Sequence, residues 1–239
     1  MLLRYFYDPK LAQASYFVGC QQASEAIVID PARDVEPYLA TAEAEGMRIV
    51  AATETHIHAD FVSGSRELAE RTGATLYLSD TGNANWKYRF ADAYDHVLLQ
   101  DGDLFRIGNV KFEALHTPGH TDGHFAYLFG DRLFSGDALL IDGCGRTDFQ
   151  NGSVDDLFHS VRGKLFSLPD DTLVYPGHDY HDRRVSTIAQ EKRRNPRLGE
   201  AVSLEQFRKL MAELDLPYPK FIDHAVPGNR RCGVCPSDM

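Results

Sequence analysis

The order of strand-like and helix-like segments is the feature that most constrains the fold of this chain. Short apolar runs that end in turn residues predict strands, and segments with apolar residues at helical spacing that end in Gly or Pro predict helices. The predicted strands span residues 15–19, 26–30, 48–53, 75–79, 110–115, 125–129, 132–135 and 172–175, and the predicted helices span 34–45, 63–71, 154–168, 185–194 and 203–214. This mixed order indicates an α/β domain whose helices pack outside its sheets.

Composition narrows the class of protein. With 239 residues, of which 43% are hydrophobic, the chain can bury a substantial core, and we expect one domain over residues 1–239, with 200–239 as a C-terminal helix and irregular wrap. A net charge of -10 without a basic stripe argues against nucleic-acid binding. Because the first residues lack a secretory signal and no run of about 18 apolar residues occurs, we predict a cytoplasmic protein with no membrane contact.

Histidine and aspartate residues gather directly after predicted strands. The clusters are THIHAD at 55–60, TPGHT at 117–121, SGD at 135–137 and PGHD at 176–179. A rigid strand end holds side chains in fixed positions, and imidazole and carboxylate groups are common metal ligands. One such histidine alone is more often a hydrogen-bonded loop residue, but packing does not easily explain four clusters, because buried unpartnered imidazoles and carboxylates are costly. The candidate metal-site residues are His56, His58, Asp60, His120, Asp137 and His178.

The order of these motifs resembles that of the metallo-β-lactamase superfamily. The resemblance implies an αββα sandwich, in which two mixed sheets carry helices on both outer faces and a cleft at one sheet edge holds metal. Most members are hydrolases with two metals, and their HxHxDH motif ends in a histidine that binds the second metal. Phe61 takes the place of that histidine. Because the second site keeps only Asp60, Asp137 and His178, we predict a single firmly bound metal.

A closer resemblance, to the persulfide dioxygenases or sulfur dioxygenases, extends from the first strands into the tail. It is carried by THIHAD, GRTDFQ at 145–150, YPGHDY at 175–180, VST at 185–187, NPRL at 195–198 and AVPGNRRCG at 225–233. GRTDFQ and the ending from NPRL to AVPGNRRCG are the specific parts, because the general hydrolases of the superfamily need neither.

This resemblance implies one Fe(II) per chain, bound by His56, His120 and Asp137. Two imidazoles and one carboxylate on one face of ferrous iron leave positions open for substrate and dioxygen together. The residues implied to support this centre from outside the ligand set are His58, Asp60, Phe61 and His178, and for His58 direct ligation stays open. Phe61 is expected to keep competing water away.

The resemblance also implies the reaction, in which a thiol persulfide, dioxygen and water give sulfite and the free thiol. Tyr180 and Arg197 match family residues that bind the low-molecular-weight thiol, glutathione or a similar carrier. An arginine suits this role because its planar guanidinium can bind a carboxylate with two hydrogen bonds. For Arg146, Thr147 and Asp148 of GRTDFQ, we favour a loop-shaping ion pair over direct catalysis.

The same comparison suggests partners. Phe61 resembles a bacterial branch whose chains often continue into rhodanese domains, and no such domain follows within residues 1–239. We therefore expect a stand-alone dioxygenase or one that works with a separate rhodanese-type sulfurtransferase. We also expect a homo-oligomer, either a dimer or a tetramer.

Two other functions stay open. A thioester hydrolase resembling glyoxalase II would attack its substrate with metal-bound hydroxide, and Phe61 argues against it. A non-catalytic sulfur-carrier module would load sulfur on Cys20 or on the pair Cys232 and Cys235, but buried cysteines are common and we favour packing for all three. A single CxxC is weak evidence for a zinc site.

Overall fold

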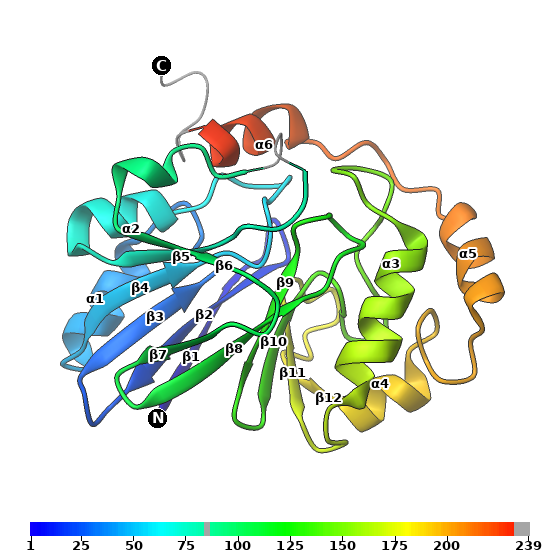
Figure 1. The fold of residues 1–239 in the computed structure, drawn as a ribbon, viewed down its shortest axis with the longest axis horizontal. Coiled ribbons are helices and arrows are strands. Elements are labelled where there is room, and N and C mark those ends of the chain that lie inside the picture. The colour runs from blue at the N-terminus through cyan, green and yellow to red at the C-terminus, as the bar shows by residue number, and fades with distance from the viewer. Residues whose placement is uncertain (84–86, 232–239) are drawn as a thin grey trace.

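The chain forms two six-stranded mixed sheets packed face to face, with helices on both outer faces (Figure 1). This computed structural model describes residues 1–83 and 87–231 and confirms the predicted αββα class. The first sheet contains β1 (Leu2–Asp8), β2 (Gln13–Cys20), β3 (Glu25–Ile29), β4 (Arg48–Thr53), β5 (Thr75–Ser79) and β6 (His96–Leu99) in that spatial order. The second sheet runs β12 (Ser186–Thr187), β11 (Leu173–Pro176), β10 (Arg132–Gly136), β9 (Phe125–Phe129), β8 (Val110–His116) and β7 (Leu104–Ile107).

Strand direction explains where the first helices lie. β3, β4 and β5 are parallel neighbours, and parallel strands need crossover connections. Helices α1 (Glu36–Ala44) and α2 (Ser65–Thr72) supply these connections and cover the outer face of the first sheet. On the second sheet, β7 to β10 are antiparallel, and only the pair β10 and β11 is parallel among the described strands of that sheet.

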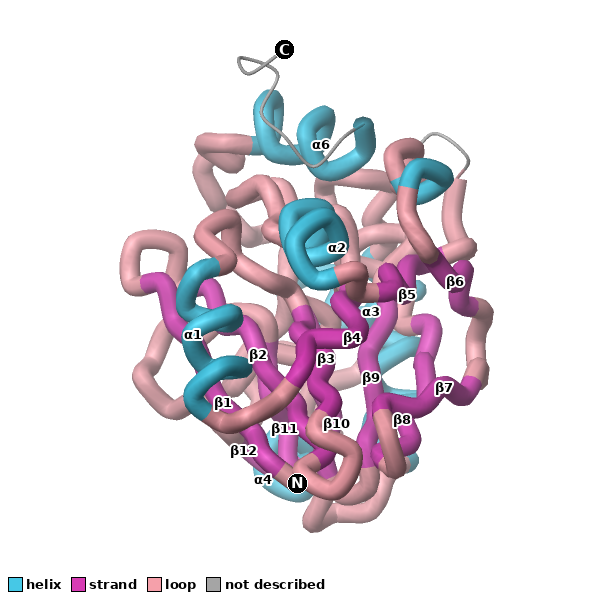
Figure 2. The backbone as a smooth tube through the Cα atoms, turned by 90° about the vertical axis from the view of Figure 1, so that its left-hand side faces the viewer, coloured by secondary structure: helices cyan, strands magenta, loops and turns pink. Residues whose placement is uncertain are grey.

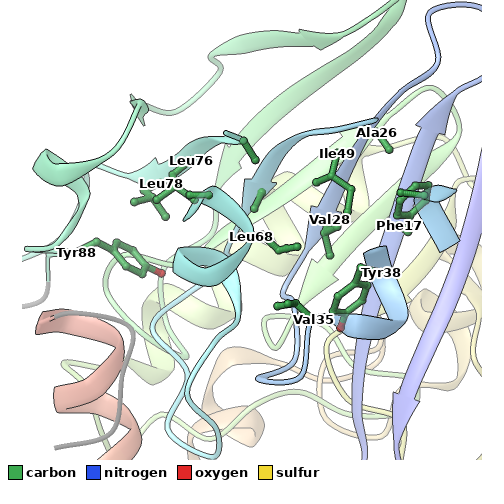
Figure 3. Close-up of a cluster of buried hydrophobic side chains, with 14 of the residues drawn as sticks. Phe17, Ala26, Val28, Val35, Tyr38, Ile49, Leu68, Leu76, Leu78 and Tyr88 are labelled. Carbon is green, nitrogen blue, oxygen red and sulfur yellow. The ribbon is translucent and has the colours of Figure 1, made fainter. Parts of the chain in front are cut away.

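The alternation of side chains along each strand builds separate cores. In β3, Ala26 and Val28 face the helices, whereas Ile27 and Ile29 face the other sheet. Figure 3 shows the first of these cores, where Tyr38 of α1 and Leu68 of α2 pack on the sheet. The core between the sheets is rich in aromatic rings, which include Tyr16, Phe112, Phe125, Tyr127 and Phe134. Two apolar faces per strand are what a sandwich covered by helices requires.

The outer face of the second sheet is covered by the C-terminal half of the chain. Its helices are α3 (Val154–His159), α4 (Ile188–Arg194) and α5 (Leu204–Ala212). The helix predicted over 154–168 changes its winding, because a π-helical turn at Ser160–Lys164 and a 3-10 turn at Leu165–Ser167 follow α3. The helix predicted over 185–194 begins later. Ser186 and Thr187 pair with β11 as an edge strand, and the Thr187 side chain accepts the Gln190 N–H and so caps α4.

The tail differs most from the expectation. An irregular wrap was predicted after residue 214, and this is wrong for Ile222–Arg231, which forms helix α6 across one end of the sandwich (Figure 2). Pro227 and Gly228 favour a break in isolation. Burial of Ile222, Ala225 and Val226 outweighs that preference. Strands β1, β6 and β7 are further elements that the sequence pattern did not predict. No helix in the described parts of the chain is long and apolar enough to cross a membrane.

Candidate metal centre

His56, His120 and Asp137 come together from three loops. His56 follows β4 of the first sheet, whereas His120 and Asp137 follow β8 and β10 of the second. One possible ligand atom from each of the three lies within 4.8 Å of the others. The Nε2 atoms of the two histidines are 3.3 Å apart, and His120 Nε2 is 3.7 Å from Asp137 Oδ2. The structure thus gathers the three residues that the sequence nominated as ligands.

The hydrogen bonds behind the two rings decide which nitrogens carry protons. His120 Nδ1 donates to the Arg146 carbonyl oxygen at 2.7 Å. Thr55 Oγ1 donates to Asp30, so it accepts from His56 Nδ1 at 3.0 Å. Burial, together with neighbouring imidazoles, holds the pKa of His56 well below its ordinary value. With Nδ1 as the proton donor of each neutral ring, both Nε2 atoms present lone pairs and converge with a carboxylate oxygen of Asp137. A cation satisfies this arrangement, so the donor set fits a metal ion.

The segment 145–150, GRTDFQ, contacts all three ligand loops. Gly145 N–H donates to the Asp137 carbonyl oxygen at 2.7 Å, the Arg146 carbonyl oxygen accepts from His120, and Gln150 Nε2 donates to the Ile57 carbonyl oxygen at 2.6 Å. A Cβ at position 145 would lie 2.7 Å from the His120 ring, so only glycine fits there. Arg146 forms a two-pronged ion pair with Asp148, at 2.6 and 2.7 Å, which is the ion pair predicted for this loop.

The three residues that the resemblance assigned to a second metal site, Asp60, Asp137 and His178, are hydrogen-bonded to one another in series. His178 Nδ1 lies 2.8 Å from Asp137 Oδ1, and its Nε2 lies 3.0 Å from Asp60 Oδ2. Burial alone would lower the pKa of His178, but Asp137 and Asp60 outweigh it and hold that pKa well above its ordinary value. Phe61 packs its ring on His58, with the centroids 4.3 Å apart, and offers no ligand atom. His178 thus bridges the carboxylates of Asp137 and Asp60 by two hydrogen bonds.

His58 belongs to a separate buried network. Its Nε2 lies 3.2 Å from Asp30 Oδ1 and 3.1 Å from Glu54 Oε2, and Glu54 also accepts bonds from Ser63 and Ser65. Burial alone would lower the pKa of His58, but the two carboxylates raise it to about 10. Asp30, Glu54 and His58 also place ligand atoms within 4.8 Å of one another, yet protein donors already bind their carboxylates. We interpret this network as a support for the metal loop.

Sequence reasoning missed Asp30 and Glu54. Each directly follows a buried strand, and Asp30 has a φ of 50°, which is uncommon outside glycine. An acidic residue that continues an apolar strand was the available signal. The remaining nitrogen of His58, Nδ1, is buried and has no hydrogen-bond partner in the described part of the chain, while its ring centroid is 4.2 Å from that of His56.

A cleft of about 660 Å³ opens onto this centre. His56, His120 and Asp137 line it together with Tyr180 and Arg197, the two residues that the family resemblance implied as contacts for the thiol. Arg197 Nη1 donates to the Cys144 carbonyl oxygen at 3.1 Å, and within the described residues its guanidinium forms no salt bridge. Tyr180 is 64% exposed and stacks on His178. Residues 216–220, between α5 and α6, form another wall.

Comparison with known proteins identifies the family to which this chain belongs. Residues 8–178 match the profile described as the metallo-beta-lactamase superfamily. Over 238 residues, the chain is 42% identical to human mitochondrial persulfide dioxygenase ETHE1, which covers 98% of this chain and 89% of that protein. The chain belongs to the persulfide dioxygenase family. The crystal structure of ETHE1 from Myxococcus xanthus superposes with a TM-score of 0.90 at 43% identity, covering 98% of this chain and all of that one.

The similarity to hydrolases of the superfamily covers a smaller part of the chain. A hydroxyacylglutathione hydrolase from Polaromonas sp. is 37% identical over 182 residues, which covers 74% of this chain and 66% of that protein. The persulfide dioxygenases match nearly the whole chain, and GRTDFQ forms contacts with all three ligand loops here. The similarity to persulfide dioxygenases therefore covers more of the chain than the similarity to the hydrolase does.

The two described cysteines of this persulfide dioxygenase are buried. Cys20 is 5% exposed, which confirms the packing predicted for it, and its sulfur accepts the Asn109 N–H. Cys144 is also buried, and burial raises the pKa of its thiol to about 11, so it is a poor nucleophile. Cys232 and Cys235 lie outside the described residues.

Proposed function

We propose that this chain is a mononuclear iron persulfide dioxygenase for a low-molecular-weight thiol persulfide. In the reaction, RSSH, O2 and H2O give RSH, sulfite and two protons. The sulfane sulfur loses four electrons to dioxygen, and the S–S bond breaks to release the thiol. Near-full-length likeness to persulfide dioxygenases is the observation that carries the proposal. The converging acceptors of His56, His120 and Asp137 support it.

The proposed ligands are these three residues, and their side chains fit ferrous iron because two imidazoles and one carboxylate form a facial set. Bound ferrous iron would supply a cationic centre for the persulfide sulfur and electrons for dioxygen. The chain's own residues fix this set: Arg146 holds the His120 ring by its carbonyl oxygen, and Thr55 holds the His56 ring. Of the two carboxylate oxygens of Asp137, Oδ1 is hydrogen-bonded to His178 and Oδ2 faces His120.

Phe61, Asp60 and His178 have a different proposed role. His178 and Asp60 form a hydrogen-bonded series beside Asp137, and Phe61 packs an apolar ring on His58 at the position of the missing histidine, so that the centre keeps one metal. Phe61 is 7% exposed. This burial supports the expectation that an apolar residue at this position limits water near the centre.

Arg197 and Tyr180 are the proposed contacts for the thiol carrier. If Arg197 binds a carboxylate of glutathione persulfide, Arg197→Ala should raise KM for that substrate with little change in kcat. Charge-assisted hydrogen bonds contribute about 1.5–3 kcal/mol, so KM should rise roughly 10- to 150-fold. Steady-state oxygen consumption measures both constants.

Two controls show whether Arg197 acts by binding a carboxylate. Arg193 of α4 is exposed, so Arg193→Ala should leave KM unchanged. Cysteamine persulfide has no carboxylate, so its KM should respond little to Arg197→Ala. An equal rise in KM for both persulfides would show that Arg197 acts by shaping the cleft and not by binding a carboxylate.

An anaerobically iron-loaded sample tests the reaction itself. We expect oxygen uptake with glutathione persulfide or coenzyme A persulfide, and one sulfite formed per oxygen consumed. Comparison of the two substrates gives the preferred carrier. Absence of uptake with every persulfide, combined with two zinc ions per chain and thioester hydrolysis, would assign the chain to the hydrolase function.

We also propose a homo-oligomer and a separate rhodanese-type sulfurtransferase as donor of the persulfide. Val97 and Leu98 on edge strand β6 and Leu104 on edge strand β7 are exposed apolar side chains, which supports contact between copies. Light scattering would test this, since a monomeric mass at micromolar concentration contradicts it. A persulfidated rhodanese would pass its sulfane sulfur to glutathione and regain its own thiol, and the iron-loaded chain would oxidise the glutathione persulfide; sulfite formation in this mixture tests the donor.

A further inference from the structure

The loop that carries His56 and His58 is not held by its own backbone. Within the described residues, no backbone-to-backbone hydrogen bond involves residues 56–63, although Thr55 and Gly64 on either side are bonded to Phe125 and Pro31. His56, His58, Phe61 and Ser63 are nonetheless all buried. Buried peptide groups need partners, so side chains from elsewhere must supply them.

Two buried carboxamides supply these partners. Gln150 donates to the Ile57 carbonyl oxygen. Asn229 of α6 makes three bonds: its Nδ2 donates to the carbonyl oxygens of His58 at 2.9 Å and Phe61 at 2.8 Å, and its Oδ1 accepts the Ser63 N–H at 2.8 Å. Asn229 is 3% exposed, and both of its N–H donors and its oxygen are used.

The position of Asn229 is itself fixed by packing. Ile222, Ala225 and Val226 on the same helix are buried, and Val226 belongs to the core that includes Leu68 of α2. Helix α6 lies at the end of the sandwich where the metal loop emerges (Figure 2). A rigid helix therefore presents one amide to both carbonyl groups, and rigid support of this kind keeps metal ligands in register.

We propose that Asn229 is a positioning residue for the metal centre. Its amide holds the backbone on both sides of Asp60 and so fixes the direction in which the His56 ring enters the site. This assigns a role to the Asn of AVPGNRRCG, a motif whose described residues, 225–231, are not among the candidate metal ligands. The proposal rests on the metal-binding part of the proposed function and is independent of the reaction.

Asn229→Asp provides the sharpest test. An aspartate keeps the acceptor for Ser63 but turns an oxygen toward the two carbonyl groups, so two hydrogen bonds become repulsive contacts. We expect the affinity for Co(II), measured by competition with a chelator, to fall about 10- to 100-fold, as for other residues that orient ligands. The visible absorption bands of the cobalt-loaded protein should also change, because they report the ligand geometry. Asn229→Ala leaves room for water and should show a smaller loss of the same kind.

Val226→Ala is the matched control. It weakens packing of the same helix without touching the three hydrogen bonds, so it should lower Tm while leaving cobalt affinity and absorption bands as in the wild type. Wild-type affinity and bands in Asn229→Asp, or an equal loss in Val226→Ala, would overturn the proposal. If Asn229→Asp does not fold, Asn229→Ala is judged by the same two measurements. A wild-type chain that binds cobalt but consumes no oxygen with any persulfide would refute the proposed function. The comparison of the Asn229 variants with Val226→Ala would still decide whether Asn229 positions the metal ligands.

Discussion

His120→Ala should abolish persulfide-dependent oxygen consumption. The variant removes the Nε2 atom that faces His56 at 3.3 Å and Asp137 at 3.7 Å, leaving two donors from which a metal can dissociate. Residues that only orient ligands typically alter affinity or activity about 10- to 100-fold, so removal of a ligand should exceed that range. Iron per chain after anaerobic loading and desalting, together with oxygen uptake, measures the effect.

His116→Ala is a suitable control for that experiment. His116 ends the strand that leads to His120, but its Nε2 bonds the Asp122 carbonyl oxygen and does not join the ligand trio. The control should retain iron and most activity. If His120→Ala keeps full oxygen consumption, the proposed iron centre is wrong, whatever the comparisons with relatives suggest.

Glu54→Ala should cause the largest loss of stability among single substitutions at the site. Glu54 is 2% exposed and is bonded to His58, Ser63 and Ser65. Its removal leaves the buried His58 with one carboxylate fewer, takes the acceptor from the Ser65 hydroxyl, and leaves the Ser63 hydroxyl only the Pro31 carbonyl oxygen. Breaking a buried, hydrogen-bonded charge pair typically costs about 3–5 kcal/mol. Urea unfolding of the metal-free protein should show this as a lower midpoint with an unchanged slope.

A surface pair provides the contrast for Glu54. Glu36 bonds Arg71 on α2, but its side chain is 67% exposed, and solvent screens such pairs. Glu36→Ala should therefore leave the unfolding midpoint almost unchanged. Equal, small effects from the two substitutions would mean that the buried network around His58 does not stabilise the fold.

The sequence predicted most of the sandwich and the ligand trio for a physical reason. Strands with two apolar faces are readable as apolar runs, and the ends of such strands hold His56, His120 and Asp137. Family motifs then indicated which of several candidate residues to choose.

The partners of His58 were not predictable in the same way. His56 and His58 are two residues apart, yet one joins the trio and the other joins Asp30 and Glu54. Spacing along a loop does not determine the direction of a side chain; tertiary hydrogen bonds do. Helix α6 was missed because Pro227 and Gly228 indicate a break, whereas burial against α2 and the metal loop stabilises the helix.

The two sheets contribute unequally to the centre, with His56 coming from the first and His120 and Asp137 from the second. A cation held among them is thus a cross-link between the halves of the sandwich, and unfolding must release it. By linkage, the free energy of unfolding then increases with free metal by RT ln(1 + [M]/Kd). If the metal is iron, as proposed, its supply in a cell would affect the stability of the fold as well as the turnover of the substrate.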